Sequence, residues 1–210
     1  MFKPYRNEAL NLIYNLLFCD DIRLFQNNSE VGESETYPWY VLFDDDATAE
    51  NLELIVNERS HESRVRLLAA YRLRAMKMKP ALKELLGVVI EVGLEDGLDV
   101  LAAFNDESAR YINFSEKIVI WETYEKTATQ LIVNLLDAGN TVINKIGVWD
   151  KSRLSFPENG MVRMTFLVTD GIYFVQGPTN VLFKDPMSAP VLNAALALMK
   201  FLTESTLSKQ

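Results

Sequence analysis

The residue types that most often carry out acid–base or nucleophilic chemistry are nearly missing from this chain. It contains one histidine, His61, and one cysteine, Cys19. A catalytic triad could form only around His61, which follows Ser60 at the expected start of a helix, where exposed polar residues are common. Cys19 follows an apolar helix face and precedes two aspartates, which raise the pKa of a thiol and disfavour a reactive thiolate. We interpret both residues as structural.

Carboxylate clusters offer the next route to a chemical site. A structural zinc site needs several Cys or His ligands, and a chain with two such residues cannot supply them alone. Asp44, Asp45 and Asp46 could offer oxygen ligands to Mg²⁺ or Ca²⁺. However, neighbouring residues of a strand point to opposite faces, and the spacing of an EF-hand loop does not occur. We interpret the three aspartates as the acidic start of the helix that follows.

Glu95, Asp96 and Asp99 flank an expected hairpin turn. Paired carboxylates can act as acid and base when their surroundings differ strongly, and an exposed turn supplies no such difference. The chain also has no GxGxxG, Walker, GxSxG or HExxH pattern. We therefore predict no catalytic residue, no cofactor and no metal site, and we favour a protein that is not an enzyme.

The most informative sequence feature is an uneven distribution of charge. Residues 20–62 contain twelve acidic and two basic residues, whereas 64–83 contain seven basic residues and no acidic one. One interpretation is a helix that binds an anion or a protein partner, with Arg64, Arg72 and Arg74 as candidate interaction residues. The favoured interpretation is structural, because basic residues late in a helix complement its negative end and the acidic segment can pack beside it.

Helices in the first part of the chain must position these charges. Apolar residues at helical spacing predict a helix over 5–18, a short helix capped by Asp20, a helix around 52–56 and a longer helix from Ser60 to about Met78. The polar stretch 27–38 is expected to be a surface loop. The apolar run 39–43 is expected to be a strand or a packed loop.

From Leu85 the apolar period changes from 3.6 to 2, which indicates strands. Alternating runs separated by short polar turns predict an antiparallel four-strand meander over 88–121. A later hairpin over 162–176 is expected to turn at Asp170 and Gly171, in a type I′ turn. The remaining expectations are a helix over 128–135, an undecided helix or strand over 141–148, a further strand at 181–183, and a last helix capped by Asp185 or Ser188.

The order of these elements predicts an α+β fold. An antiparallel sheet, made of about a four-strand meander plus a hairpin, is covered by helices, and a helical region precedes it. We expect this N-terminal region, 1–58, to pack on an α+β domain, 59–210, in one compact unit. A chain of 210 residues can bury such a core without disulfides or metals.

Composition limits the range of partners. Twenty-one Lys and Arg residues against 29 Asp and Glu give a net charge of −8, which argues against nucleic acid and anionic membrane surfaces. Polar residues interrupt the N-terminal apolar positions, so no signal peptide is predicted, and no apolar run approaches the roughly 18 residues of a membrane span. A single cysteine fits a reducing compartment. We therefore expect a cytoplasmic protein without nucleic-acid or membrane partners.

Aromatic residues suggest where a protein partner could bind. Trp121 lies in the last strand of the expected meander and points to the face opposite Ile118 and Ile120. If helices cover only one face of the sheet and Trp121 lies on the other, its ring is exposed, and aromatic residues are enriched in interfaces. Trp121 is therefore a further candidate interaction residue.

Two resemblances accompany this interpretation. The segments NLLFCDD (15–21), ESRVRLLAAYRLR (62–74) and DGLDVLAAF (96–104) resemble uncharacterised bacterial proteins of similar length, a resemblance that implies no activity. From Ser60 onward, the order of helices and strands is similar to that of type III secretion chaperones.

The leading expectation is a non-catalytic intracellular protein that binds a protein partner or a second copy of itself. Chaperone-like, adaptor and immunity-type roles all fit such a protein. The alternative is a carboxylate-based enzyme, or a binder of a small anionic ligand through the basic helix 64–83.

Overall fold

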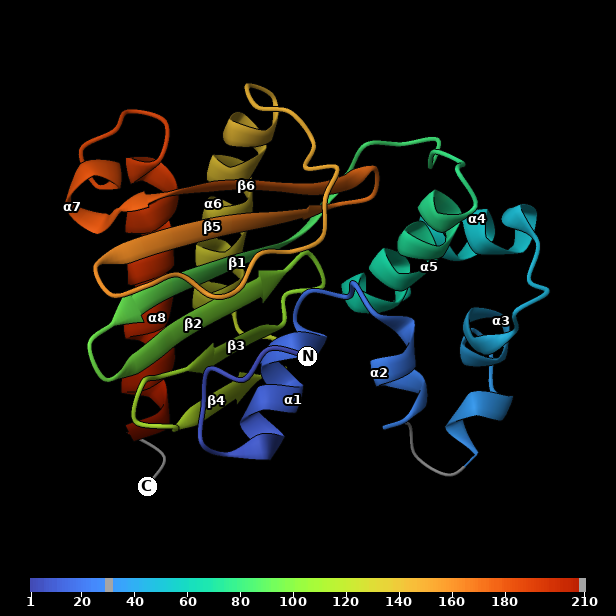
Figure 1. Ribbon diagram of the computed structural model, residues 1–210, viewed down its shortest axis with the longest axis horizontal. Coiled ribbons are helices and arrows are strands. Elements are labelled where there is room, and N and C mark those ends of the chain that lie inside the picture. Colours follow the sequence, from blue (N-terminus) through green and yellow to red (C-terminus); the bar gives the residue numbers. More distant parts are fainter. Residues whose placement is uncertain (29–31, 208–210) are drawn as a thin grey trace.

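The computed structural model, which describes residues 1–28 and 32–207, is an α+β protein with helices packed on one antiparallel sheet (Figure 1). The helices are α1 (Glu8–Leu16), α2 (Ile22–Gln26), α3 (Trp39–Phe43), α4 (Ala49–Asn57), α5 (Ser63–Ala75), α6 (Lys126–Ile143), α7 (Thr179–Leu182) and α8 (Ala189–Leu207), with a 3-10 turn at Glu33–Glu35. The strands are β1 (Leu85–Leu94), β2 (Gly97–Phe104), β3 (Ala109–Ile112), β4 (Ile118–Trp121), β5 (Met161–Val168) and β6 (Gly171–Pro178).

The six strands lie in the order β4-β3-β2-β1-β5-β6, and every neighbouring pair is antiparallel. The first four strands form the predicted meander, and the hairpin of β5 and β6 adds to its other edge along β1. The predicted α+β class and the antiparallel sheet are confirmed. Within the described residues, no helix is both long and apolar enough to cross a membrane.

Helices cover both faces of the sheet. On one face, alternate strand residues such as Val88 and Phe166 pack with α6 and α8. On the opposite face, Val89 and Leu98 pack with α1 and α4 of the N-terminal region and with α5, and Figure 1 shows α1 and α6 on opposite sides of the sheet. Burial of apolar side chains drives this layered arrangement, and the expectation that helices cover only one face is wrong.

Two short apolar segments differ from their predicted structure, and the sequence leaves a third open. The run at 39–43 forms α3, and the run at 181–183 lies in and just after α7, so neither is a strand. The undecided segment 141–148 continues α6 as far as Ile143. Gly139 lies inside this helix and does not end it. The helix packs closely on the sheet at this point, since a Cβ at Gly139 would be 3.0 Å from Leu85 and 3.2 Å from Phe166.

The hairpin between β5 and β6 is confirmed, but its turn lies one residue earlier than predicted. Val168 pairs with Gly171, which leaves Thr169 and Asp170 as the two turn residues. Neither has a positive φ, whereas a type I′ turn needs positive φ at both central positions. The predicted type I′ turn is therefore wrong, although Gly171 follows immediately with φ +156°.

Candidate functional site

The basic side chains of 64–83 largely bind backbone carbonyls of other segments. Arg66 donates to Val56 (2.8 Å), Arg72 to Val41 (3.0 Å) and Leu42 (2.7 Å), Arg74 to Thr169 (2.7 Å) and Lys83 to Ile143 (3.0 Å). The last carbonyls of a helix have no partner inside that helix, so most of these bonds satisfy acceptors at the ends of α3, α4 and α6. These bonds support a structural explanation of the basic residues in 64–83. The sequence predicts that they complement the end of their own helix, whereas they bind the ends of other helices.

Trp121 is not an exposed aromatic residue. It is 8% exposed and its ring packs edge-on against Phe201 of α8, with ring centroids 5.5 Å apart. The sequence placed Trp121 correctly on the face opposite Ile118 and Ile120, but that face is covered by α6 and α8. The condition for an exposed Trp121, an uncovered face of the sheet, is therefore not met.

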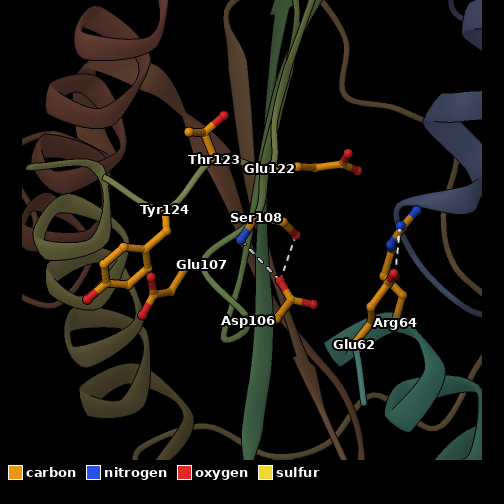
Figure 2. Close-up of a pocket in the computed structure, with 8 residues that line it drawn as sticks. All are labelled: Glu62, Arg64, Asp106, Glu107, Ser108, Glu122, Thr123 and Tyr124. Atoms are coloured by element: carbon orange, nitrogen blue, oxygen red, sulfur yellow. Dashed lines mark hydrogen bonds and ion pairs between the residues drawn. The ribbon is translucent and has the colours of Figure 1, made fainter. Parts of the chain in front are cut away.

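Arg64 lines a polar pocket of about 340 Å³, shown in Figure 2. We call it the acidic pocket, and its lining residues are Glu62, Arg64, Asp106, Glu107, Ser108, Glu122, Thr123 and Tyr124. They come from three places: the start of α5, the turn between β2 and β3, and the segment that follows β4. Sequence reasoning identified Arg64 but did not bring these carboxylates together, because they are separated by up to 60 positions and meet only through the strand order.

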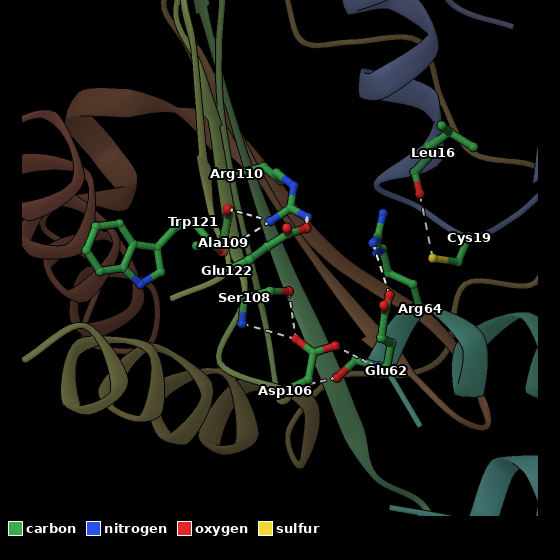
Figure 3. A network of polar contacts seen from close by, with 11 residues as sticks. Leu16, Cys19, Glu62, Arg64, Asp106, Ser108, Ala109, Arg110, Trp121 and Glu122 are labelled. Atoms are coloured by element: carbon green, nitrogen blue, oxygen red, sulfur yellow. Dashed lines mark hydrogen bonds and ion pairs between the residues drawn. The ribbon is translucent and has the colours of Figure 1, made fainter. Parts of the chain in front are cut away.

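Asp106 fixes the position of α5 relative to the sheet. Its Oδ2 accepts a hydrogen bond from the backbone N–H of Ser63 (2.7 Å), and its own N–H donates to Ser63 Oγ (3.0 Å). Its Oδ1 accepts from the N–H (3.1 Å) and hydroxyl (2.6 Å) of Ser108 (Figure 3). A carboxylate at a helix N-terminus satisfies unpaired N–H groups there. The helix therefore begins at Ser63, not at Ser60 as predicted.

Arginines partly neutralise the carboxylates of the acidic pocket. Arg64 pairs with Glu62 (3.1 Å), and Arg110 pairs with Glu122 while also donating to the carbonyls of Ala109 and Trp121. Burial and the nearby Arg64 lower the pKa of the Arg110 guanidinium. Four carboxylates against these two guanidinium groups leave an excess of negative charge. Figure 2 shows the four carboxylates with Arg64, and Figure 3 shows both arginines beside their glutamates. The pocket is therefore suited to a cationic group.

The acidic pocket lies at the end of an edge strand. Among the described residues, β4 pairs only with β3, so its outer edge has no neighbouring strand. Its Ile120 side chain is 54% exposed, and Tyr124 beyond the strand is 80% exposed. The opposite edge, β6, is partly covered, since Trp149 donates its backbone N–H to Ile172 O at 2.7 Å. Of the two edges, β4 is the more open.

The remaining candidates from the sequence lie outside this pocket. Cys19 is buried, and burial raises the pKa of its thiol. The ring of His61 packs against Tyr37 at 5.4 Å between centroids. Within the described residues, no group of three or more Asp, Glu, His or Cys side chains could hold a metal ion, and this includes Asp44 to Asp46.

A second cavity, of about 270 Å³, lies between the sheet and α8. Its walls are almost wholly apolar, with Ile90 and Leu101 from the sheet and Leu192 and Met199 from α8 among them. Asp99 is the one charged residue in its lining, and both of its oxygens accept hydrogen bonds, from Tyr111 (2.9 Å) and from the N–H of Phe114 (2.7 Å). No free polar group in this cavity indicates a particular ligand.

Comparison with known proteins does not assign the chain. No protein-family model, no curated protein and no solved structure matches it. Function must therefore be argued from the geometry described above.

Proposed function

We propose that this protein is a non-catalytic intracellular protein that binds a partner protein, and that it takes up an extended basic segment of that partner. The observation that carries the proposal is the open edge of β4, which leads directly into the acidic pocket. An extended segment can add to an exposed sheet edge through main-chain hydrogen bonds, while its alternate side chains enter neighbouring pockets.

Charge complementarity supports a basic partner. A segment lying along β4 brings its side chains past the exposed Ile120 and towards Glu122 and Glu107. A Lys or Arg side chain there meets an excess of carboxylates, and such complementarity speeds encounter and discourages acidic partners. The net charge of −8 acts in the same direction over the whole molecule. Chaperone-like, adaptor and immunity-type roles are all compatible with this mode of binding.

The alternative of a small anionic ligand held by the helix 64–83 has less support. Arg66, Arg72 and Lys83 are already bonded to backbone carbonyls, and removing them from those acceptors leaves buried polar groups unpaired. Arg64 faces carboxylates in the acidic pocket, where an anion is repelled.

Peptide binding tests the proposal. The probes are two labelled eight-residue peptides, one alternating lysine with valine and the other alternating glutamate with valine, titrated with the full chain in a fluorescence-anisotropy assay. We expect saturable binding of the lysine peptide that weakens with salt, and at least about tenfold weaker binding of the glutamate peptide. No saturable binding of the lysine peptide, or equal affinity for both, would falsify the proposal.

A pair of variants locates the binding site. Ile120→Lys places a charge on the edge strand, which blocks strand addition, and we expect it to reduce the affinity at least about tenfold. Leu54→Lys makes the same change at a 61% exposed apolar position on α4 and should leave the affinity unchanged. Equal affinity in both variants would place binding elsewhere. A second copy of the chain is the other possible occupant of the β4 edge. Light scattering of the chain without peptide tests this: a dimer that the Ile120→Lys substitution dissociates would show that a second copy, and not a basic segment, binds there.

A further inference from the structure

A third cavity, of about 500 Å³, lies where the N-terminal helices, the β5–β6 turn and the segment 148–153 meet. We call it the composite pocket. Its volume falls within the roughly 300–1,000 Å³ range of small-molecule sites, and such sites often form where separate parts of a chain pack together. It contains Arg74, the remaining candidate of the basic run, and lies apart from the acidic pocket, with which it shares no lining residue.

The composite pocket is lined by charges of both signs in equal number. Arg74, Lys151 and Arg153 line it together with Asp20, Asp150 and Asp170, and Arg153 Nε forms an ion pair with Asp20 Oδ2 (2.8 Å). A purely anionic ligand is repelled by the aspartates, and a purely cationic ligand by the basic groups. A small molecule that carries one charge of each sign can place each of them beside an opposite charge. The charge pattern therefore favours a zwitterion.

Hydrogen-bonding groups of both kinds are free in this pocket. Within the described part of the chain, Arg74 donates only through Nη1, to Thr169 O, which leaves its Nε and Nη2 without a partner. Asp20 uses Oδ2 to accept from Arg153 Nε (2.8 Å), and its Oδ1 has no partner in that same part of the chain. Donors suited to a carboxylate and an acceptor suited to an ammonium group therefore line one cavity.

Two more atoms of the pocket residues are unsatisfied. Arg153 Nη1 and Asp170 Oδ1 are buried, and neither has a hydrogen-bond partner among residues 1–28 and 32–207. A buried polar atom without a partner costs free energy, so its persistence in a native fold calls for an explanation. Both atoms are enclosed by protein, so they mark incompletely paired charges beside the pocket, and the groups that a ligand could use are those of Arg74 and Asp20.

The pocket is held in shape by its surroundings. Arg153 donates to Asn15 Oδ1 (3.0 Å), and its guanidinium lies 3.8 Å from the ring centroid of Phe18. Trp149 is fixed by its backbone bond to Ile172 and by a bond from its ring N–H to Ser152 O (3.0 Å). Side chains that are already ordered lose little further entropy on binding.

We propose that the composite pocket binds a small zwitterion of the amino-acid type. Its carboxylate is held by Arg74, its ammonium group lies beside Asp20 and Asp170, and Trp149 and Tyr71 contact its side chain. This site is independent of the proposed binding of a basic segment along β4, so either proposal can fail without the other.

Calorimetric titration of the full chain with tryptophan, leucine, glutamate and lysine tests the proposal. Tryptamine and indole-3-propionate serve as matched probes, since they lack the carboxylate and the ammonium group of tryptophan. We expect saturable binding of at least one amino acid, and binding about tenfold or more weaker for an analogue that lacks either charge. If none of the four amino acids binds, or if either single-charge analogue binds as tightly as tryptophan, the proposal is wrong.

Two arginines of the same helix provide a matched pair of variants. Arg74→Gln removes the free donors in the pocket, whereas Arg72→Gln removes a guanidinium that binds Val41 and Leu42 outside it. We expect the first variant to weaken amino-acid binding about tenfold or more and the second to leave it unchanged. If Arg74→Gln does not fold, Asp20→Asn provides the same test from the acidic side. Unchanged binding in Arg74→Gln, or in Asp20→Asn, overturns the assignment.

Discussion

Glu91 is a carboxylate buried between the sheet and the N-terminal region. The Tyr14 hydroxyl donates to its Oε1 at 2.7 Å, and Arg163 Nη1 lies 3.6 Å from Oε2. Burial raises the pKa of Glu91, and the hydrogen bond from Tyr14 and the charge of Arg163 only partly oppose this. In the sequence Glu91 occupies the polar position of an alternating strand, which is typical of a residue that faces solvent. It is buried because α1 covers that face.

The raised pKa of Glu91 predicts how its contribution to stability depends on pH. A carboxyl whose pKa is higher in the folded state stabilises the fold below its unfolded pKa, and this contribution is lost as pH rises through the folded pKa. Glu91→Gln keeps the side chain neutral at every pH. We therefore expect the free energy of unfolding of Glu91→Gln, relative to the natural chain, to increase as the pH rises above about 4.5. Urea unfolding at a series of pH values measures this difference.

Glu95→Gln serves as the control for this experiment, because Glu95 is exposed in the β1–β2 turn. Its free energy of unfolding should stay parallel to that of the natural chain across the same pH range. A difference between Glu91→Gln and the natural chain that does not change with pH would contradict a raised pKa at Glu91.

Gly93 shows how closely two backbone segments approach each other. A Cβ at this position would lie 2.0 Å from the carbonyl oxygen of Glu158, whereas a Cβ at Gly147 would have no atom within 4 Å. Because a backbone carbonyl cannot move aside as a side chain can, we expect Gly93→Ala to lower the free energy of unfolding by about 1–3 kcal/mol. Gly147→Ala should change it little. Thermal or urea unfolding of the pair checks this, and equal stability of the two variants would argue against the close contact.

At the scale of single residues, the sequence identified some members of the candidate sites but not the sites. Arg64 and Arg74 stood out by charge, and each lines a pocket. Asp106 and Glu122 gave no signal, because an acidic residue in a turn or after a strand is common. Trp121 was placed on the correct face of its strand, but periodicity alone does not tell whether a helix from a distant part of the chain covers that face.

At the scale of elements, long periodic segments were predictable and short apolar ones were not. The strands of the meander have an apolar period of 2 that no helix reproduces, so their existence followed from the sequence. The five residues of α3 and the four of α7 are too few to show a period. The start of α5 was also misplaced, because its partner Asp106 lies 43 positions later in the chain. Local residues cannot reveal a cap that comes from another element.

Removing that distant cap should destabilise α5. Asp106→Ala leaves the N–H of Ser63 without its acceptor, and loss of a helix-capping side chain costs about 0.5–2 kcal/mol. We expect a decrease in the free energy of unfolding of that size and faster amide hydrogen exchange in the first turn of α5. Asp96→Ala, in the exposed β1–β2 turn, is the matched control and should change neither quantity. Unchanged exchange in Asp106→Ala would show that the bond does not hold the helix start.

At the scale of the whole molecule, the sheet is shared between two cores. The N-terminal helices pack on one face and α6 and α8 on the other. The division into 1–58 and 59–210 therefore remains a prediction about folding units. The sequence predicted a layer of helices on an antiparallel sheet. It could not show that the N-terminal region covers the face opposite α6 and α8, since no local pattern encodes contacts between distant segments.

Deletion of residues 1–58 tests whether the remainder folds alone. The deletion removes Tyr14 from the carboxylate of Glu91 and Tyr5 from the carbonyl of Leu98, while α5 stays on the sheet. We expect 59–210 to lose cooperative thermal unfolding and to bind a hydrophobic dye, while the full chain unfolds in a single transition. A cooperative transition in the shortened chain would show that 59–210 is an autonomous domain.

Long-range hydrogen bonds that involve the first 75 residues have a consequence for the synthesis of the chain. Tyr5 donates to Leu98 O, Arg74 donates to Thr169 O, and Arg153 donates to Asn15 Oδ1. The bonded residues are 93, 95 and 138 positions apart in the sequence. At roughly 5–20 residues per second, the ribosome needs on the order of 5–20 s after Arg74 to make the β5–β6 turn, whose Thr169 accepts the bond from Arg74. Until β1 and β2 are made, the helices made first have no sheet face to pack on. The apolar faces of α1 and α4 therefore stay uncovered in the nascent chain until β1 and β2 emerge, and the bond from Arg74 forms only after the β5–β6 turn is made.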